Sequence, residues 1–239
     1  MHVWLFDIDG TLIDTGGAGR RAFEVVLAGE FGVTALNVAA RAGRVSFSGR
    51  TDRAIAGDLF RSHGIDDSTE NWDRFLETYL AELGATLSSG NGQVLPGVAE
   101  LLEALDQRAD CELGLLTGNV QDGAQRKLAH YGLERYFAFG GFGNTFVDRN
   151  DVARMAVSAA GDFLSVPTEN VRFENIRFHV VGDTPADVRC ARSIGATAVA
   201  VSTGKFTSEQ LSATGPDVCV EDLRDNAPLF ELLDGPLLA

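Results

Sequence analysis

The stretch that decides the fold of this chain stands near its N-terminus and reads Val3-Trp4-Leu5-Phe6-Asp7-Ile8-Asp9-Gly10-Thr11-Leu12. Its first four residues are apolar without alternation, which is typical of a strand buried on both faces of a parallel sheet. Two aspartates and a glycine follow at once, so we expect the strand to end at Asp7 and the chain to turn. Ligands bind outside the carboxyl ends of such strands, so the two acids are candidates for a functional site.

The rest of the chain alternates between strand-like and helix-like patterns. Further apolar runs predict strands at residues 113–116, 137–142, 178–181 and 197–201. Apolar residues with helical spacing lie between them, over residues 98–105, 124–131 and 152–159. This alternation indicates an α/β fold with right-handed crossovers. From about residue 215 onward the chain is acidic and rich in leucine, and we expect a terminal helix there.

One segment breaks the alternation. From Thr15 to Gly92 apolar residues keep helical spacing and no convincing strand pattern occurs. We therefore expect an α-helical cap domain of residues 15–92, inserted into an α/β core domain of residues 1–14 and 93–239.

The composition narrows the class of protein. The chain of 239 residues has 34 acidic and 20 basic side chains and a net charge of −14. This charge argues against general nucleic-acid binding and against an anionic membrane surface. No apolar run approaches the ~20 residues of a membrane span, and the N-terminus turns acidic too early for a signal peptide. Three widely spaced cysteines predict neither a disulfide framework nor a zinc site, so we expect a cytoplasmic protein.

Polar residues follow the other predicted strands as well. These residues are Thr117, Gly118 and Asn119 after the second strand, Lys127 on the next helix, and Asp183 and Asp187 after the fourth strand. Each has a simpler explanation as part of a turn, a helix cap or a solvated helix face. Their placement at successive strand ends favours one shared site.

These motifs resemble those of the haloacid dehalogenase-like hydrolase superfamily. They are Asp7-Ile8-Asp9-Gly10-Thr11-Leu12, Thr117, Lys127 and Gly182-Asp183 with Asp187. The helical insert resembles the cap of the phosphoglycolate phosphatase and β-phosphoglucomutase branch, and the similarity covers essentially the whole chain. It implies a Rossmann-like, mainly parallel core. Dehalogenases of the superfamily lack the second aspartate, so Asp9 indicates phosphoryl chemistry.

The resemblance also implies a role for each residue. Asp7 would be the nucleophile of an aspartyl-phosphate intermediate, and Asp9 the general acid and then the general base. Mg²⁺ would be bound by Asp7, the backbone carbonyl of Asp9 and Asp183, while Asp187 would bind it or orient its ligands. Lys127 would neutralise charge between Asp7 and the phosphoryl oxygens. The other phosphate-binding groups would be Thr117, Gly118 and Asn119.

Cationic residues are candidates for holding the rest of the substrate. In the expected cap these are Arg20 and Arg50, since an arginine there would hold a carboxylate or a second phosphate in a bidentate manner. Arg50 also fits a helix start with an exposed side chain. Arg149 and Lys205 stand in loops that we expect to border the cleft.

The preferred function is that of a Mg²⁺-dependent phosphatase of a small phosphorylated metabolite, acting as a monomer or homodimer. A phosphomutase would use the same core, but no cap base is identified for it. A phosphonatase is disfavoured because no lysine stands between Met1 and Gly92. A regulatory binding module is the alternative from another class, and Asp9 argues against it. Phosphoglycolate, a sugar phosphate and a nucleotide monophosphate all remain open as substrates.

Overall fold

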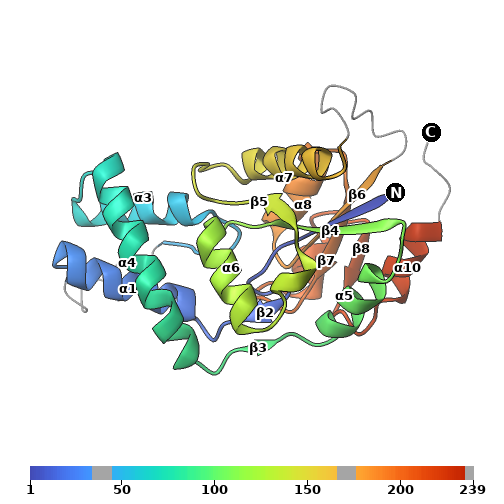
Figure 1. Ribbon diagram of the computed structural model, residues 1–239, viewed down its shortest axis with the longest axis horizontal. Coiled ribbons are helices and arrows are strands. Elements are labelled where there is room, and N and C mark those ends of the chain that lie inside the picture. The colour runs from blue at the N-terminus through green and yellow to red at the C-terminus, as the bar shows by residue number, and fades with distance from the viewer. Residues whose placement is uncertain (34–44, 166–175, 235–239) are drawn as a thin grey trace.

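A six-stranded parallel sheet forms the centre of the computed structural model, which describes residues 1–33, 45–165 and 176–234 (Figure 1). Its strands are β1 (His2–Phe6), β4 (Cys111–Leu116), β5 (Phe139–Gly141), β6 (Arg177–Gly182), β7 (Thr197–Val201) and β8 (Val218–Val220). They lie in the order β5-β4-β1-β6-β7-β8, and every neighbouring pair is parallel. The expected α/β fold with a mainly parallel sheet is therefore confirmed.

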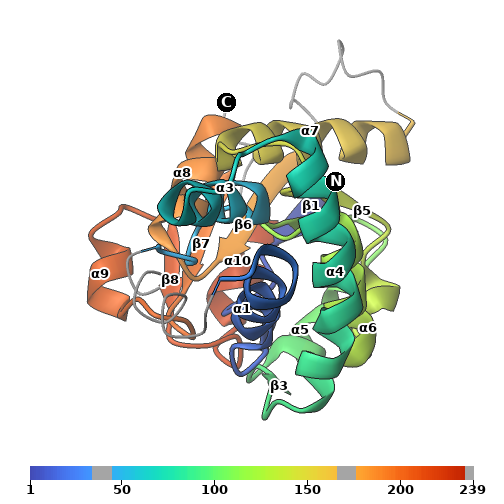
Figure 2. The ribbon, with the colours of Figure 1, turned by 90° about the vertical axis from the view of Figure 1, so that its left-hand side faces the viewer.

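Helices cover both faces of this sheet (Figures 1 and 2). They are α5 (Val98–Asp106), α6 (Gln121–His130), α7 (Arg149–Phe163), α8 (Pro185–Ser193), α9 (Ser208–Ser212), α10 (Ala227–Asp234) and the 3-10 turn η1 (Glu134–Tyr136). Trp4 and Phe6 of β1 belong to the core formed with α5, α6 and α10. Val3 and Leu5 belong to the core formed with α7, α8 and α9. Because both faces are buried, the first strand is apolar at every position. Among the described helices, none combines the length and the apolar character needed to cross a membrane.

A second, small sheet stands where the helical segment leaves and rejoins the chain of the core. Its two strands, β2 (Ile13–Asp14) and β3 (Gln93–Val94), pair antiparallel, with Ile13 opposite Val94. Between them lie α1 (Ala18–Phe31), α3 (Asp52–His63) and α4 (Thr69–Ser88), and no strand occurs between β2 and β3 within the described residues. These three helices share an aromatic core that contains the fully buried Phe60 and Phe75.

The C-terminal part differs from the expectation. In place of a helix throughout, Val218–Val220 forms the edge strand β8, and α10 occupies Ala227–Asp234. A strand of three residues is too short to give a pattern in the sequence, and its parallel pairing with β7 fixes it instead. The strand predicted from the apolar run at residues 137–142 is shorter in the structure, where only Phe139–Gly141 forms β5. Residues 34–44 of the expected cap and residues 235–239 of the expected terminal helix lie outside the described part, as do residues 166–175.

Two histidines are buried side by side in neighbouring strands of the sheet. His2 Nδ1 lies 3.0 Å from His179 Nε2, and the His179 ring stacks on Trp4 with a centroid separation of 4.3 Å. Burial, with a smaller contribution from the neighbouring His2, lowers the pKa of His179 to about 3. His179 is therefore neutral in the folded protein at neutral pH.

This pair predicts an acid-sensitive contribution to stability. The unfolded chain binds a proton at His179 near pH 6.5, whereas the folded chain does so only near pH 3. The contribution is thus fully present above pH 6.5 and is lost as the pH falls towards 3. As the pH falls from 7.5 to 5.5, the unfolded state gains a proton at His179 that the folded state does not. We expect this to lower the unfolding free energy of the wild type by about 1.4 kcal/mol.

Urea unfolding of the wild type and His179→Gln at both pH values measures this effect, because glutamine keeps a hydrogen-bonding group and cannot ionise. The change in unfolding free energy between the two pH values should be more negative for the wild type by about that amount. Equal changes in the two proteins would contradict the prediction.

Candidate active site

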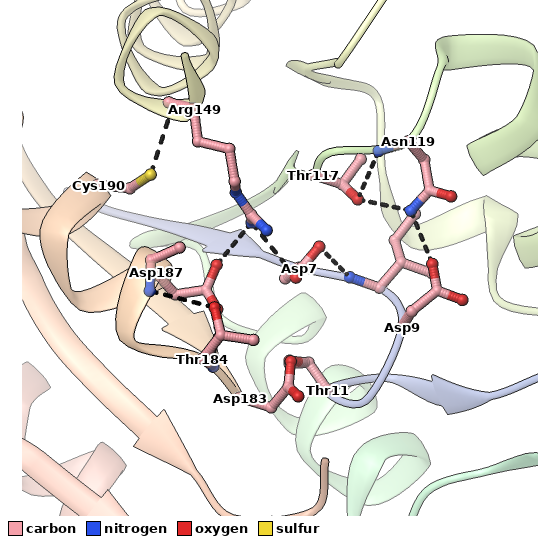
Figure 3. Close-up of polar contacts among 12 residues, drawn as sticks. Asp7, Asp9, Thr11, Thr117, Asn119, Arg149, Asp183, Thr184, Asp187 and Cys190 are labelled. Atoms are coloured by element: carbon pink, nitrogen blue, oxygen red, sulfur yellow. Dashed lines mark hydrogen bonds and ion pairs between the residues drawn. The ribbon is translucent and has the colours of Figure 1, made fainter. Parts of the chain in front are cut away.

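The predicted acids meet at one edge of the sheet, where β1, β4 and β6 end (Figure 3). A cavity of about 520 Å³ opens there between these strand ends and the helical insert. Of the residues expected in the site, those that line the cavity are Asp7, Asp9, Arg20, Arg50, Gly118, Asn119, Lys127 and Asp183. Thr117 and Asp187 lie buried directly behind this lining, in contact with residues of the site.

Three carboxylates crowd the floor of the site. Each of Asp7, Asp183 and Asp187 has an oxygen within 4.8 Å of the others, and their exposed fractions are 5%, 3% and 2%. Burial, together with the negative charge of Asp187, raises the pKa of Asp7 to about 6, although the positive charge of Arg149 opposes this shift. Burial and the two other acids raise the pKa of Asp183 to about 8. A buried set of oxygen donors with excess negative charge fits a Mg²⁺ ion.

Asp187 is already engaged through both of its carboxylate oxygens. It stands in the first turn of α8, where its Oδ2 accepts hydrogen bonds from the backbone nitrogen of Thr184 at 2.9 Å and from its hydroxyl at 2.7 Å. Its Oδ1 lies 2.6 Å from Arg149 Nη2. Of the two roles left open for Asp187, this geometry favours the orienting one over direct contact with a metal.

Arg149 is the cation nearest to Asp7. It begins α7, is 7% exposed, and places Nη2 at 3.3 Å from Asp7 Oδ2 as well as against Asp187 (Figure 3). The sequence placed Arg149 only in a loop beside the cleft and gave the contact with Asp7 to Lys127. The sequence did contain a signal for this position. Arg149 begins the helix that follows the strand predicted at 137–142, so it stands on the side of the sheet where the strands end.

Lys127 belongs instead to a network around Asp9. Its Nζ donates to Asp9 Oδ2 and to Asn119 Oδ1, at 2.6 Å each. Asn119 Nδ2 donates to the same oxygen of Asp9 and to Thr117 Oγ1, at 2.8 Å each. Asp9 is thus held by a cation and an amide, while its side chain remains 41% exposed towards the cavity.

Close backbone contact joins the loop after β4 to the insert. The backbone nitrogen of Asp52 donates to the carbonyl oxygen of Gly118 at 2.7 Å. A Cβ atom at Gly118 would overlap the carbonyl oxygen of Arg50, so only glycine permits this approach. The insert therefore contacts the loop that carries Thr117 and Asn119.

The two candidate arginines of the insert, Arg20 and Arg50, line the cavity but are paired with acids. Arg20 Nε lies 3.0 Å from Glu24, one turn along α1. Arg50 forms an ion pair with Asp58 and donates to the carbonyl oxygen of Ala54 at 3.3 Å. Arg50 stands directly before Thr51, the N-cap of α3, so the expected helix start is confirmed, but its side chain is half-buried and paired and not exposed.

Among the other residues of the insert that line the cavity, Asp52 and Tyr79 carry titratable groups for which the sequence analysis predicted no role in the site. Asp52 is 9% exposed, and its Oδ2 accepts a hydrogen bond from the backbone nitrogen of Val120 at 2.9 Å. Burial raises the pKa of Asp52 to about 6, against the opposing charge of Lys127. Tyr79 is 1% exposed, and its hydroxyl has no hydrogen bond within the described residues. Its spacing on α4 matched that of ordinary core residues.

Comparison with known proteins gives a consistent family likeness. A model of the haloacid dehalogenase-like hydrolases matches residues 4–201. A phosphoglycolate phosphatase of Agrobacterium fabrum is 29% identical over 236 residues, covering 96% of this chain and 92% of that protein.

Solved structures share the fold. A hydrolase from Pseudomonas syringae superposes with a TM-score of 0.69 at 21% identity, covering 98% of this chain and 99% of that one. A protein described as a putative β-phosphoglucomutase from Thermotoga maritima superposes with a TM-score of 0.62 at 23% identity, covering 98% of this chain and 100% of that one. At these identities the likeness concerns the fold.

The three crowded carboxylates predict that Asp183→Asn raises thermal stability in the absence of metal and weakens the stabilisation by Mg²⁺. Asp183→Asn removes one of three mutually repelling acids, so we expect a higher Tm in EDTA. Mg²⁺ at about 100 times its Kd should stabilise the wild type by about 2.7 kcal/mol, or about 5–10 °C in Tm. Most of that increase should vanish in the variant. Thermal melts with and without Mg²⁺ measure both effects, and Glu77→Gln, which removes an exposed carboxylate of α4, is the control. An Mg²⁺ response as large in Asp183→Asn as in the wild type would contradict the assignment.

Proposed function

Because the chain belongs to the haloacid dehalogenase-like hydrolase family, we propose that this enzyme is a Mg²⁺-dependent phosphatase that acts on a small phosphate monoester through an aspartyl-phosphate. The observation that carries the proposal is the position of Asp7 and Asp9. Both line one cavity at the end of β1, Asp7 among buried acids and Asp9 beside Lys127.

Asp7 is the proposed nucleophile. Its backbone nitrogen donates to the carbonyl oxygen of Val181 at 3.0 Å, which fixes it between β1 and β6. Its Oδ1 accepts from the backbone nitrogen of Ile8 at 2.8 Å, and Oδ2 faces Arg149. In the first step an oxygen of Asp7 forms a bond to phosphorus as the bond to the leaving oxygen breaks.

Asp9 is the proposed proton carrier. In the first step it gives a proton to the departing alkoxide oxygen, and in the second it takes one from the water that cleaves the aspartyl-phosphate. Lys127 and Asn119 both donate to Oδ2 of Asp9, which fixes the orientation of the carboxyl group. Turnover needs a group with this function, whereas simple binding does not.

Positive charge must balance the acids and the phosphate. Like charges about 4 Å apart cost about 4 kcal/mol per pair at an effective dielectric of about 20. Arg149 offsets part of this cost at Asp7 and Asp187. When bound, Mg²⁺ would supply further positive charge to the phosphoryl oxygens, and Asp7, the carbonyl of Asp9 and Asp183 are the residues proposed to hold it. The backbone nitrogen of Gly118, with Thr117 and Asn119, is proposed to donate to those oxygens.

Residues 15–92 are proposed to form the cap, and residues 1–14 and 93–239 the core. The paired strands β2 and β3 at the two crossings support this division. A cavity bounded by both parts favours a small ester over a phosphoprotein. Curated relatives bear the name phosphoglycolate phosphatase, so 2-phosphoglycolate is the first ester to assay.

A phosphomutase of the β-phosphoglucomutase type is the second candidate, and the structure of the Thermotoga maritima protein supports it only through the fold. Within the described residues, the insert contributes no histidine or lysine to the cavity lining. No histidine or lysine of the insert is thus placed to activate a sugar hydroxyl, and the remaining carboxyl group, that of Asp52, already accepts a hydrogen bond from Val120, which favours hydrolysis.

Phosphate release from a panel of small esters tests the proposal. We expect Mg²⁺-dependent release by the wild type, none detectable with Asp7→Asn, and a loss of about 10²–10⁴-fold in kcat with Asp9→Asn. Glu77→Gln should behave as the wild type. Retention of activity by Asp7→Asn would refute the nucleophile. Transfer of the phosphoryl group to a sugar phosphate without release would establish the mutase instead.

A further inference from the structure

We propose that Asp52 is a positioning residue, which anchors the insert on helix α6 and thereby keeps Lys127 shielded from water beside Asp9. The proposal rests on the phosphatase function where it concerns turnover, and it adds a residue of the insert to those that act on the reaction. The contact between Asp52 and α6, which we call the anchor, is a property of the folded chain and can be tested without a substrate.

The side chain of Asp52 meets the start of α6. It is buried, and its Oδ2 accepts a hydrogen bond from the backbone nitrogen of Val120 at 2.9 Å. Val120 is the N-cap residue of α6 and, as a valine, has no side-chain oxygen that could accept hydrogen bonds there. The positive end of the helix dipole lies at this terminus, so a carboxylate is favoured beside it. The insert therefore supplies to α6 an acceptor that the helix does not carry itself.

Backbone contacts hold the same part of the insert against two loops of the core. The backbone nitrogen of Asp52 donates to the carbonyl oxygen of Gly118 at 2.7 Å, and that of Arg53 donates to the carbonyl oxygen of Gly143 at 3.4 Å. The backbone nitrogen of Gly143 donates in turn to the carbonyl oxygen of Asn119 at 2.7 Å. A Cβ atom at Gly143 would overlap the carbonyl oxygen of Gly118, so these segments approach too closely for a larger residue. The anchor thus belongs to a tightly packed contact between insert and core.

Val120 also packs into the insert. Its side chain is buried and belongs to the aromatic core that contains Phe75 and Tyr79. A Cβ atom at Gly123, in the first turn of α6, would lie 3.5 Å from the ring of Tyr79. The insert therefore holds the start of α6 through a hydrogen bond and through apolar contacts together.

Helix α6 carries Lys127 to Asp9 beneath the insert. The Lys127 side chain is only 4% exposed, and its Nζ donates to Asp9 Oδ2 at 2.6 Å. A Cβ atom at Gly19 of α1 would lie 3.4 Å from Lys127 Nζ and 3.9 Å from the hydroxyl oxygen of Tyr79. Residues of α1 and α4 thus cover the ammonium group. Loss of this cover would admit water to the ion pair and weaken it, because water screens the attraction between charges.

The charges on the two sides of this contact are complementary. Burial raises the pKa of Asp52, and the positive charge of Lys127 is the largest effect that opposes this shift. Asp52 and Lys127 therefore attract each other across the boundary between insert and core. A buried ammonium group is costly unless it is paired, so the insert brings a second carboxylate towards Lys127 in addition to that of Asp9.

An anchor at this point acts on the reaction through Asp9. Lys127 orients the proposed proton carrier, so looser cover of Lys127 should slow the proton-transfer steps more than it weakens binding of the ester. Asp52 also lines the cavity. The test therefore has to separate action through Lys127 from direct contact with the ester.

Lysine acetylation measures the anchor directly, because the chain has two lysines of opposite exposure. Lys127 is buried, whereas Lys205 is exposed and serves as the internal reference. The proteins are treated with an N-hydroxysuccinimide ester of acetate without substrate, and the labelling of each lysine is read by mass spectrometry. The ratio of Lys127 to Lys205 labelling should rise by about 10- to 100-fold in Asp52→Ala, since the lost hydrogen bond has a charged acceptor.

Two further variants identify the cause of the exposure. Asp52→Asn removes the same charge but keeps an oxygen that can accept from Val120, so its labelling ratio should lie well below that of Asp52→Ala. Ser68→Ala is the matched control, because it removes the N-cap hydrogen bond to Asn71 at the start of α4 and weakens the insert elsewhere. Ser68 stands roughly 16 Å before Tyr79 along the helix axis. This variant should keep the labelling ratio of the wild type.

Turnover with Mg²⁺ tests whether Asp52 acts through Lys127. With the ester that the wild type hydrolyses fastest, Asp52→Ala should lower kcat by about tenfold and change KM by less than about threefold. In the Lys127→Met background the same substitution should lower kcat by less than about twofold, because the residue through which it acts is gone.

The outcomes separate this inference from the function on which it rests. The anchor is overturned if Lys127 stays protected in Asp52→Ala, if the alanine and asparagine variants are labelled equally, or if Ser68→Ala exposes Lys127 as much as Asp52→Ala does. An equal loss of kcat in both backgrounds overturns the action through Lys127. If the wild type hydrolyses no ester, the phosphatase function fails, while the labelling still decides the anchor.

Discussion

The repulsion among three buried carboxylates is the constraint on which the site depends. Asp7, Asp183 and Asp187 come from two neighbouring strands and the helix that follows one of them, so the sheet itself forces them together. Unpaired buried charges are costly, and Arg149 pairs with only two of the acids. Asp183 is left with a single 3.4 Å hydrogen bond from Thr11 among its side-chain contacts in the described part of the chain. The folded protein is therefore poised to take up positive charge at this point.

Asp9 has a different environment from Asp7, and this difference separates the two proposed roles of nucleophile and proton carrier. Asp7 is enclosed and faces an arginine, whereas Asp9 is partly exposed and is held by Lys127 and Asn119. A spacing of two residues at a strand end is enough to place one acid in the floor and the other at the side of the same cavity. The two proposed chemical roles thus need no long-range movement of the core.

The positions of the acids could be predicted from the sequence because parallel strands end at a common edge. Which cation meets which acid could not, since Lys127 and Arg149 lie on helices whose distance from Asp7 depends on packing. Tyr79 was hidden for a similar reason, because its spacing on α4 is that of a core residue and its hydroxyl gives no periodic signal. The edge strand β8 was missed because three residues carry no pattern of their own.

The small sheet of β2 and β3 explains how the core accommodates so large an interruption. Ile13 pairs with Val94 and Asp14 with Gln93, so the chain returns beside the point where it left. To the core, the entire helical segment is equivalent to the loop of a β-hairpin, and the separation of its ends does not grow with its length. Closing such a loop costs free energy that rises only logarithmically with the number of residues. Evolution could thus lengthen, shorten or exchange this segment while the strands that carry the acids keep their register.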